Sequence, residues 1–185
     1  MSEEDKKIIE DFLTGKDEAF GELLKKYLKP VYNFLRIMVK DPDILDDLTQ
    51  ETFIKAWKNL RKFKPNKNFK TWIFTIAKNT ALDYFKKKKT IPFSNFVNEE
   101  GNNHLENMQT DEILPLEILE KAEREKNFEK KLEELSADYR TILLLHYKED
   151  FSLQEISEIL DTSYNTIKSR HQRALLALKK ILNLS

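Results

Sequence analysis

The spacing of apolar residues between positions 20 and 38 limits what this chain can fold into more than any other feature of its sequence. Apolar side chains recur there at steps of three and four residues, as the following set shows: Phe20, Leu23, Leu24, Tyr27, Leu28, Val31, Tyr32, Leu35 and Met38. This period is that of a helix with one buried side. The 185 residues include only three Gly and five Pro, and few β-branched residues alternate with polar ones. We therefore expect an all-α protein.

A second helix is predicted to begin at Asp41 and Pro42. Asp is a favoured N-cap residue, and Pro is tolerated at the first helical position because its missing N–H would have no partner there. We expect this helix to run to about Leu60. Its core candidates are Leu45, Leu48, Phe53 and Trp57.

Three polar side chains of this second helix share one face, because Asp47, Gln50 and Glu51 lie at positions i, i+3 and i+4. Such a group commonly forms a solvated helix surface. The alternative is a docking face for a basic helix of a partner protein, and the spacing alone leaves both interpretations open.

Basic and aromatic residues interleave between positions 55 and 89. This stretch contains 12 Lys or Arg and a single acid, Asp83. A surface this positive attracts polyanions, and aromatic rings offer stacking partners to unpaired bases, so single-stranded or opened nucleic acid is the favoured ligand. The alternative is a lysine-coated helical domain whose aromatic residues form its core.

The next segment has the opposite charge, so the formal net charge of zero hides a strong segregation. Residues 90–120 contain seven acids and no Lys or Arg. Pro-containing stretches bracket this segment, and it shows no helical period. We expect a flexible acidic linker at 91–125 between two small helical domains at 1–90 and 126–185.

The C-terminal domain carries the pattern of a helix-turn-helix. Ser152 and Glu155 have the spacing of a capping box, which predicts a helix start. A short turn at Asp161 and Thr162 leads into a helix from about Ser163 that carries only basic charges. A tight turn followed by a basic helix is typical of the unit that inserts its second helix into the DNA major groove, although a plain helix pair with a basic surface shows the same pattern.

Several classes of protein are disfavoured. The sequence has no Cys, no apolar run near the ~20 residues of a membrane span, and an acidic start unlike a signal peptide. His104, His146 and His171 lack the spacing of a metal site, and no Gly-rich phosphate loop is present. We therefore expect a cytoplasmic protein that is not an enzyme, needs no cofactor or metal, and does not insert into membranes.

Two long motifs then resemble a known family. The stretches DDLTQETFIKAW (46–57) and FKTWIFTIAKNTALD (69–83) resemble region two of bacterial RNA polymerase sigma factors, especially the extracytoplasmic-function (ECF) group of the sigma-70 family. The stretches FSLQEISEIL (151–160) and TIKSRHQRA (166–174) are similar to region four of the same family. The resemblance implies a region 2 helical bundle at 1–90 and a region 4 helix-turn-helix at 126–185. It also implies a dissociable subunit that binds core polymerase, recognises promoter DNA and promotes transcription initiation.

The resemblance further assigns roles to individual residues. Docking onto the clamp helices of the largest polymerase subunit is implied for Asp47, Gln50 and Glu51. Contact with the minus-ten element, including a flipped base of the melted non-template strand, is expected for Asn66, Lys67, Asn68, Lys78, Asn79, Asp83, Lys86 and Lys87. Contact with the duplex of the minus-thirty-five element is implied for Tyr164, Asn165, Lys168, Ser169, Arg170, Gln172 and Arg173. An anti-sigma factor is a further possible partner.

Three positions depart from the region 4 pattern. Asp161 stands where Gly is usual, and Asp tolerates the left-handed backbone better than most residues. Ser157 replaces a usual Ala, and it is small enough for a close helix approach. His171 occupies a usually apolar position, where we expect it to pack inside the domain.

A stand-alone helix-turn-helix regulator that binds DNA without polymerase is the alternative function. It would leave the face of Asp47, Gln50 and Glu51, and the basic aromatic stretch, without a purpose. A nucleic-acid enzyme is a third possibility, but no cluster of candidate catalytic residues supports it.

Overall fold

A computed structural model describes residues 1–64, 66–88 and 128–182, and these residues form helices and no strand. The expected all-α class is confirmed. The linker predicted at 91–125 lies outside the described residues.

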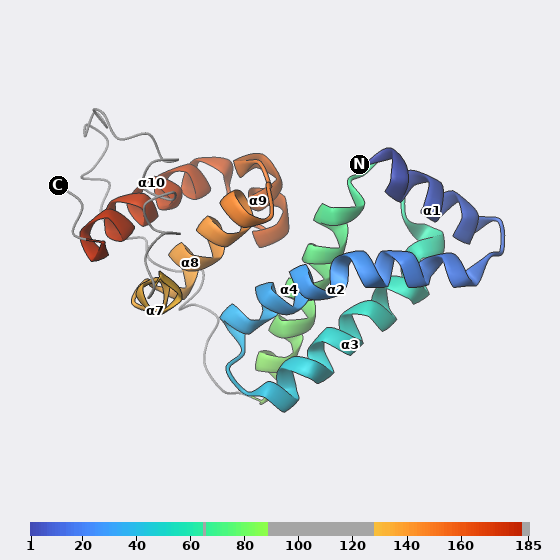
Figure 1. Ribbon diagram of the computed structural model, residues 1–185, viewed down its shortest axis with the longest axis horizontal. Helices are drawn as coiled ribbons and strands as arrows, with labels where there is room; N and C mark the ends of the chain where they lie inside the picture. The colour runs from blue at the N-terminus through green and yellow to red at the C-terminus, as the bar shows by residue number, and fades with distance from the viewer. Residues whose placement is uncertain (65, 89–127, 183–185) are drawn as a thin grey trace.

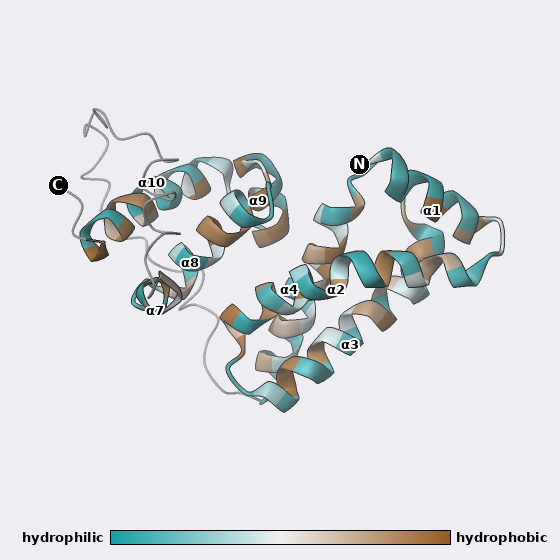
Figure 2. Cartoon of the chain, viewed as in Figure 1, coloured by the Kyte–Doolittle hydropathy of each residue, from teal (hydrophilic) through white to brown (hydrophobic). Residues whose placement is uncertain are grey.

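Three helices form the N-terminal bundle: α2 (Phe20–Met38), α3 (Pro42–Asn59) and α4 (Phe69–Lys88). Each contacts the other two, as Figure 1 shows. Short 3-10 turns precede α2 (Asp17–Ala19) and follow α3 (Leu60–Lys62). In Figure 2 hydrophobic and hydrophilic residues are interleaved along these helices, as the three- and four-residue spacing requires. The predicted start of α3 is confirmed, because the Asp41 side chain accepts from the backbone N–H groups of Asp43 and Ile44.

An additional helix, α1 (Glu3–Leu13), packs against α2 and was not anticipated from the sequence. Ser2 caps it, and Ile8, Ile9 and Phe12 face the core. The buried carboxylate of Asp5 accepts hydrogen bonds of 2.7 Å from both Tyr27 Oη and Lys26 Nζ. Burial opposes ionisation of Asp5, but these hydrogen bonds outweigh it and lower its pKa. The charged carboxylate therefore ties α1 to α2.

The C-terminal half contains α7 (Phe128–Glu133), α8 (Ala137–Leu143), a π-helical turn (Leu144–Lys148), α9 (Leu153–Leu160) and α10 (Tyr164–Ile181). The predicted capping box is present, with Ser152 and Glu155 bonded to each other's backbone N–H. Asp161 adopts the left-handed conformation at the end of α9, with φ 53° and ψ 49°, and Ser163 caps α10. The expected helix-turn-helix is thus confirmed in its local detail.

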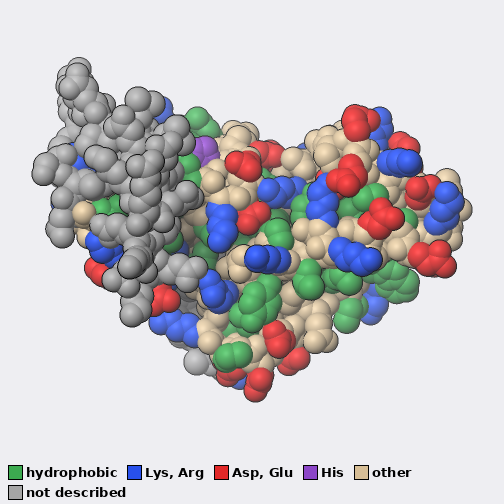
Figure 3. Space-filling model, in the orientation of Figure 1, with side chains coloured by type: hydrophobic (Ala, Val, Ile, Leu, Met, Phe, Trp, Pro, Cys, Tyr) green, Lys and Arg blue, Asp and Glu red, His purple; other side chains and the backbone are tan. Residues whose placement is uncertain are grey.

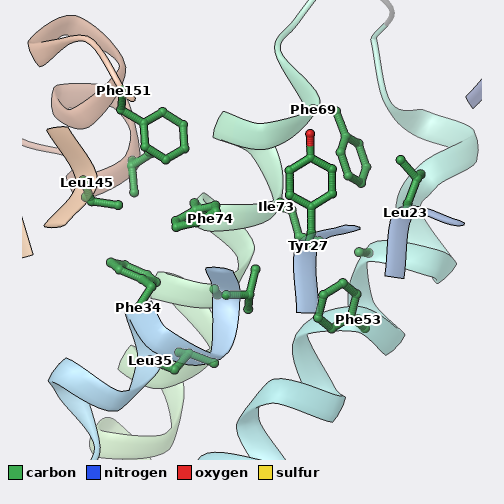
Figure 4. Close-up of a cluster of buried hydrophobic side chains, with 14 of the residues drawn as sticks. Leu23, Tyr27, Phe34, Leu35, Phe53, Phe69, Ile73, Phe74, Leu145 and Phe151 are labelled. Carbon is green, nitrogen blue, oxygen red and sulfur yellow. The ribbon is translucent and has the colours of Figure 1, made fainter. Parts of the chain in front are cut away.

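The two halves share one hydrophobic core. Phe74 of α4 lies between Phe34 of α2 and Phe151, which precedes α9, with ring centroids 5.3 Å and 5.0 Å away (Figure 4). Ile142, Leu145, Phe151, Ile156, Ile159 and Ile167 of the C-terminal half join the buried cluster of the N-terminal bundle. A second, smaller cluster lies within the C-terminal half between α8 and α10. The C-terminal half is therefore packed onto α4.

Candidate functional site

The outer face of α3 presents Asp47, Gln50 and Glu51 to solvent, as their spacing predicts. Within the described ranges, the side chains of Asp47 and Gln50 form neither a hydrogen bond nor an ion pair. Glu51 is different, because its carboxylate lies 2.9 Å from Lys55 Nζ. The same ammonium lies 3.7 Å from Asp83 of α4 and so links the two helices. Asp47 and Gln50 are therefore the residues of this face most available to a partner.

Two large apolar side chains extend this face along α3. Ile54 is 50% exposed and Trp57 is 46% exposed. The expectation that Trp57 belongs to the core is wrong, because Phe53 and Ala56 of α3, and Leu60 directly after it, fill the core there. Trp57 directly follows the buried Ala56 and points away from the core. The spacing of positions 47, 50, 54 and 57 follows one helix face and could have identified Trp57 from the sequence.

An open groove between α2 and α3 borders the same face. Its lining residues are Lys25, Leu28, Lys29, Tyr32, Asp46, Thr49 and Gln50. Leu28 is 45% exposed although it belongs to the apolar spacing of α2. Figure 3 shows hydrophobic side chains reaching the surface among charged ones on this half of the molecule. The outer face of α3 thus joins carboxylate, amide and apolar groups, which suits protein binding.

The residues predicted to contact the minus-ten element divide into exposed and covered groups. The exposed group consists of Asn66, Lys67, Asn79, Asp83, Lys86 and Lys87. Asn68 is half-buried, and its side-chain amide donates to Glu155 Oε1 at 2.9 Å. Asn68 is therefore engaged by the C-terminal half.

Lys78 is covered more completely and is only 5% exposed. No described residue forms a hydrogen bond or a salt bridge with its ammonium group. Burial lowers the pKa of Lys78, while the more distant charge of Asp161 only partly offsets this effect and Lys86 adds to it. A sequence pattern could not have revealed this burial, because residues of the other half are packed against α4.

The residues predicted to contact the minus-thirty-five element lie on α10. Tyr164, Asn165, Lys168 and Gln172 are exposed, and Ser169 and Arg173 are partly exposed. Arg170 is different, being only 8% exposed, with its guanidinium 3.6 Å from the Asp138 carboxylate of α8. The exposed set forms one face near the start of α10, and Arg170 faces the interior.

His171 packs inside the C-terminal half, in agreement with the sequence-based expectation. Its Nε2 lies 2.9 Å from Tyr147 Oη, and its ring stacks on that of Tyr147 at 5.6 Å. The ring of His146 lies 4.9 Å away, edge to face. Burial and the proximity of His146 lower the pKa of His171 to about 4. The folded protein thus holds this imidazole neutral.

This lowered pKa predicts a loss of stability on acidification. The unfolded chain binds a proton at His171 near pH 6.5, whereas the folded chain does so only near pH 4. The free energy that the neutral imidazole contributes to folding is therefore fully present above pH 6.5 and is lost as the pH falls towards 4. Between pH 7 and pH 5 the loss from His171 is expected to be roughly 2 kcal/mol. Urea unfolding of the wild type and of His171→Leu at both pH values measures it. An equal loss in the two proteins would contradict this assignment.

The described ranges contain no cluster of three or more His, Asp or Glu side chains arranged to hold a metal ion. No helix in these ranges combines the length and hydropathy that crossing a bilayer requires.

Comparison with known proteins identifies one family over each half of the chain. Residues 23–91 match the family Sigma-70 region 2, and residues 125–178 match Sigma-70, region 4. The chain is 31% identical to the ECF RNA polymerase sigma factor SigW of Bacillus subtilis (strain 168) over 179 residues, covering 96% of both proteins. It is 28% identical to SigX of the same organism, covering 91% of this chain and 86% of that protein.

Two solved structures have a similar fold. The sigma factor RpoE in complex with the anti-sigma factor NepR from Bartonella quintana superposes with a TM-score of 0.64 at 26% identity, covering 91% of this chain and 99% of that one. CnrH in complex with the cytosolic domain of CnrY shares the fold, with a TM-score of 0.65 at 21% identity and 98% of each chain covered. This chain belongs to the sigma-70 family of RNA polymerase sigma factors, in its ECF group.

Proposed function

We propose that this sigma factor docks onto core RNA polymerase through the outer face of α3. The observation that carries the proposal is the exposure of Asp47 and Gln50 without partners, beside the exposed Trp57. A large aromatic ring on a polar surface is a typical energetic anchor of a protein interface. Carboxylates next to such an anchor orient a basic partner and accelerate association. The clamp helices of the largest polymerase subunit are the proposed partner, with Glu51 contributing less because Lys55 already neutralises it.

The minus-ten element is proposed to bind along α4 and the turn before it. The side chains of Asn66 and Asn79 offer both donors and acceptors, so they can read the edge of an extruded base. The ammonium groups of Lys67, Lys86 and Lys87 suit phosphate contacts without sequence preference. Asp83 lies on the same helix, and its pairing with Lys55 orients it. Asn68 and Lys78 belong to this set only when the C-terminal half moves away from α4.

The minus-thirty-five element is proposed to bind the exposed face at the start of α10. Recognition helices of this type contact base edges with their N-terminal residues. Here these residues are Tyr164, Asn165 and Lys168, followed by Ser169, Gln172 and Arg173. We assign Arg170 a supporting role, because its ion pair with Asp138 holds α10 against α8.

The remaining assignments follow from this function. We propose that residues 1–90 and 126–185 act as separate recognition domains joined by the acidic linker at 91–125, and that the protein works in the cytoplasm. It would contribute specificity to the polymerase and no active site of its own. An anti-sigma factor is a proposed further partner, by analogy with RpoE in its complex with NepR.

Run-off transcription with purified core polymerase tests this function. Promoters are first selected from a random DNA library with the reconstituted holoenzyme. Transcripts with a defined start are then expected only when core polymerase, the sigma factor and a selected promoter are all present. Core alone and the sigma factor alone serve as controls. A protein that leaves the start sites of the polymerase unchanged, and binds duplex DNA equally well without polymerase, would instead be a stand-alone regulator.

A further inference from the structure

Lys55 of α3 extends towards α4 and contacts three polar side chains. Its Nζ lies 2.9 Å from the Glu51 carboxylate on its own helix. Across the helix pair, it donates a hydrogen bond of 3.2 Å to Thr80 Oγ1 and lies 3.7 Å from Asp83 Oδ2. The Lys55 side chain is 35% exposed, so water surrounds it only in part. The position of this ammonium group is therefore fixed from two helices.

Thr80 anchors the ammonium on the α4 side. It is 1% exposed, so its hydroxyl cannot readily exchange the hydrogen bond from Lys55 for one from water. The side chain of Asp83, in contrast, is 55% exposed. Exposed ion pairs contribute little to stability. We therefore expect the contact of Lys55 with Asp83 to fix the direction of the carboxylate, and not to hold the two helices together.

The surroundings of Asp83 suit a selective contact with a base. Asp83 is the single acid between positions 55 and 89. It lies four positions after Asn79, so both exposed side chains share one face of α4. A carboxylate accepts hydrogen bonds and cannot donate them, unlike the amide of Asn79. Adenine and cytosine carry an amino donor where guanine and thymine carry a carbonyl acceptor. A fixed carboxylate would attract the first pair of bases and repel the second.

We propose that Lys55 is a positioning residue that holds Asp83 as a selective acceptor, so that one position of the minus-ten element is preferentially adenine or cytosine. This inference rests on the proposed function, in which Asp83 contacts that element. Lys55 acts through Asp83 and contacts no base itself. Without its ammonium, the carboxylate would lose its preferred direction, and ordering it again would reduce the gain from binding the correct base.

Selection of promoters from a library randomised across the minus-ten element tests this role, with holoenzyme reconstituted from core polymerase and each variant. Asp83→Asn retains the shape of the side chain but adds a donor, so the position where it changes the preference is the one that Asp83 reads. There the wild type should favour adenine and cytosine over guanine and thymine about tenfold, within the usual range for a specific base contact.

Lys55→Met retains the length of the side chain and removes its charge. It is expected to reduce this preference at least about threefold, because the carboxylate is no longer oriented before the base arrives. The double variant Lys55→Met, Asp83→Asn should have the same preference as Asp83→Asn alone, since two residues that act through one contact are not additive. Lys55→Arg retains the charge and should restore most of the preference.

Two further variants separate positioning from a general structural effect. Thr80→Val removes the anchoring hydroxyl, leaves every charge in place and should lower the preference in the same direction. Lys58→Met removes the charge of an exposed lysine on the same helix and should leave the preference unchanged. A purely structural role of Lys55 would weaken selection of all promoters alike and would not alter the preference at a single position.

The possible failures are distinguishable. If Asp83→Asn changed the preference at one position but Lys55→Met and Thr80→Val did not, the role of Lys55 would be wrong and the proposed function would stand. If Asp83→Asn changed no position, Asp83 would read no base, and the inference would fail together with that contact. A wild-type holoenzyme that selected no sequence at all would count against the proposed function and would overturn the inference with it.

Discussion

Changing Asp47 and Gln50 together to Lys is expected to abolish promoter-dependent transcription and to weaken binding to core polymerase at least about 100-fold. Both side chains are exposed on α3 and form no hydrogen bond or ion pair within the described ranges, so their replacement should leave the fold intact. Each new ammonium would face the basic partner proposed for this face. Like charges brought together at an interface cost several kcal/mol, which accounts for the size of the effect.

Competition for core polymerase against a labelled wild-type protein measures this loss, and run-off transcription measures its consequence. Glu10→Lys provides a control, because it introduces a lysine at an exposed position of α1 and leaves α3 unchanged. It should compete as well as the wild type. Undiminished competition by the Asp47→Lys, Gln50→Lys protein would rule out the α3 face as the docking surface.

Phe74→Ala is expected to cost about 3–5 kcal/mol of unfolding free energy, the range observed when a fully buried Phe is truncated. Phe74 is 0% exposed and packs on Phe34 within the N-terminal bundle and on Phe151 of the other half (Figure 4). Truncation therefore leaves a cavity that two domains share. Neither half can collapse into it without losing its contact with the other.

Urea unfolding followed by circular dichroism measures this effect. Phe74→Leu is the matched control, since it keeps most of the apolar volume and should cost less than about 1.5 kcal/mol. If Phe74→Ala proved no more destabilising than Phe74→Leu, Phe74 would not be the central packing residue that the structure indicates.

Several helix starts were predicted from short-range patterns. Asp41 and Pro42 start α3, and Ser152 and Glu155 start α9, as their types and spacing indicate. Asp161 takes the left-handed conformation that its position in the turn requires. These features depend on hydrogen bonds between residues within about four positions of one another, so they are visible in the sequence.

The N-terminal helix α1 was missed for a different reason. Its few apolar residues lie among many charges, and its attachment depends on Asp5 meeting Tyr27 and Lys26 of α2. The carboxylate is buried because its partners arrive from another helix. The pattern of residues within one helix does not reveal its contacts with another helix.

By itself, the sequence determined the helical class, several helix starts and the spacing of the motifs proposed to bind polymerase and DNA, because each depends on neighbours along the chain. Only the tertiary structure decided that Arg170 and Lys78 are buried and that Phe151 meets Phe74. Burial depends on which helix faces pack together, and the hydrogen bond between Thr71 of α4 and Glu155 of α9 joins residues 84 positions apart. Helical periodicity shows that a face is apolar, but the shapes and charges of the folded helices determine which other face it packs against.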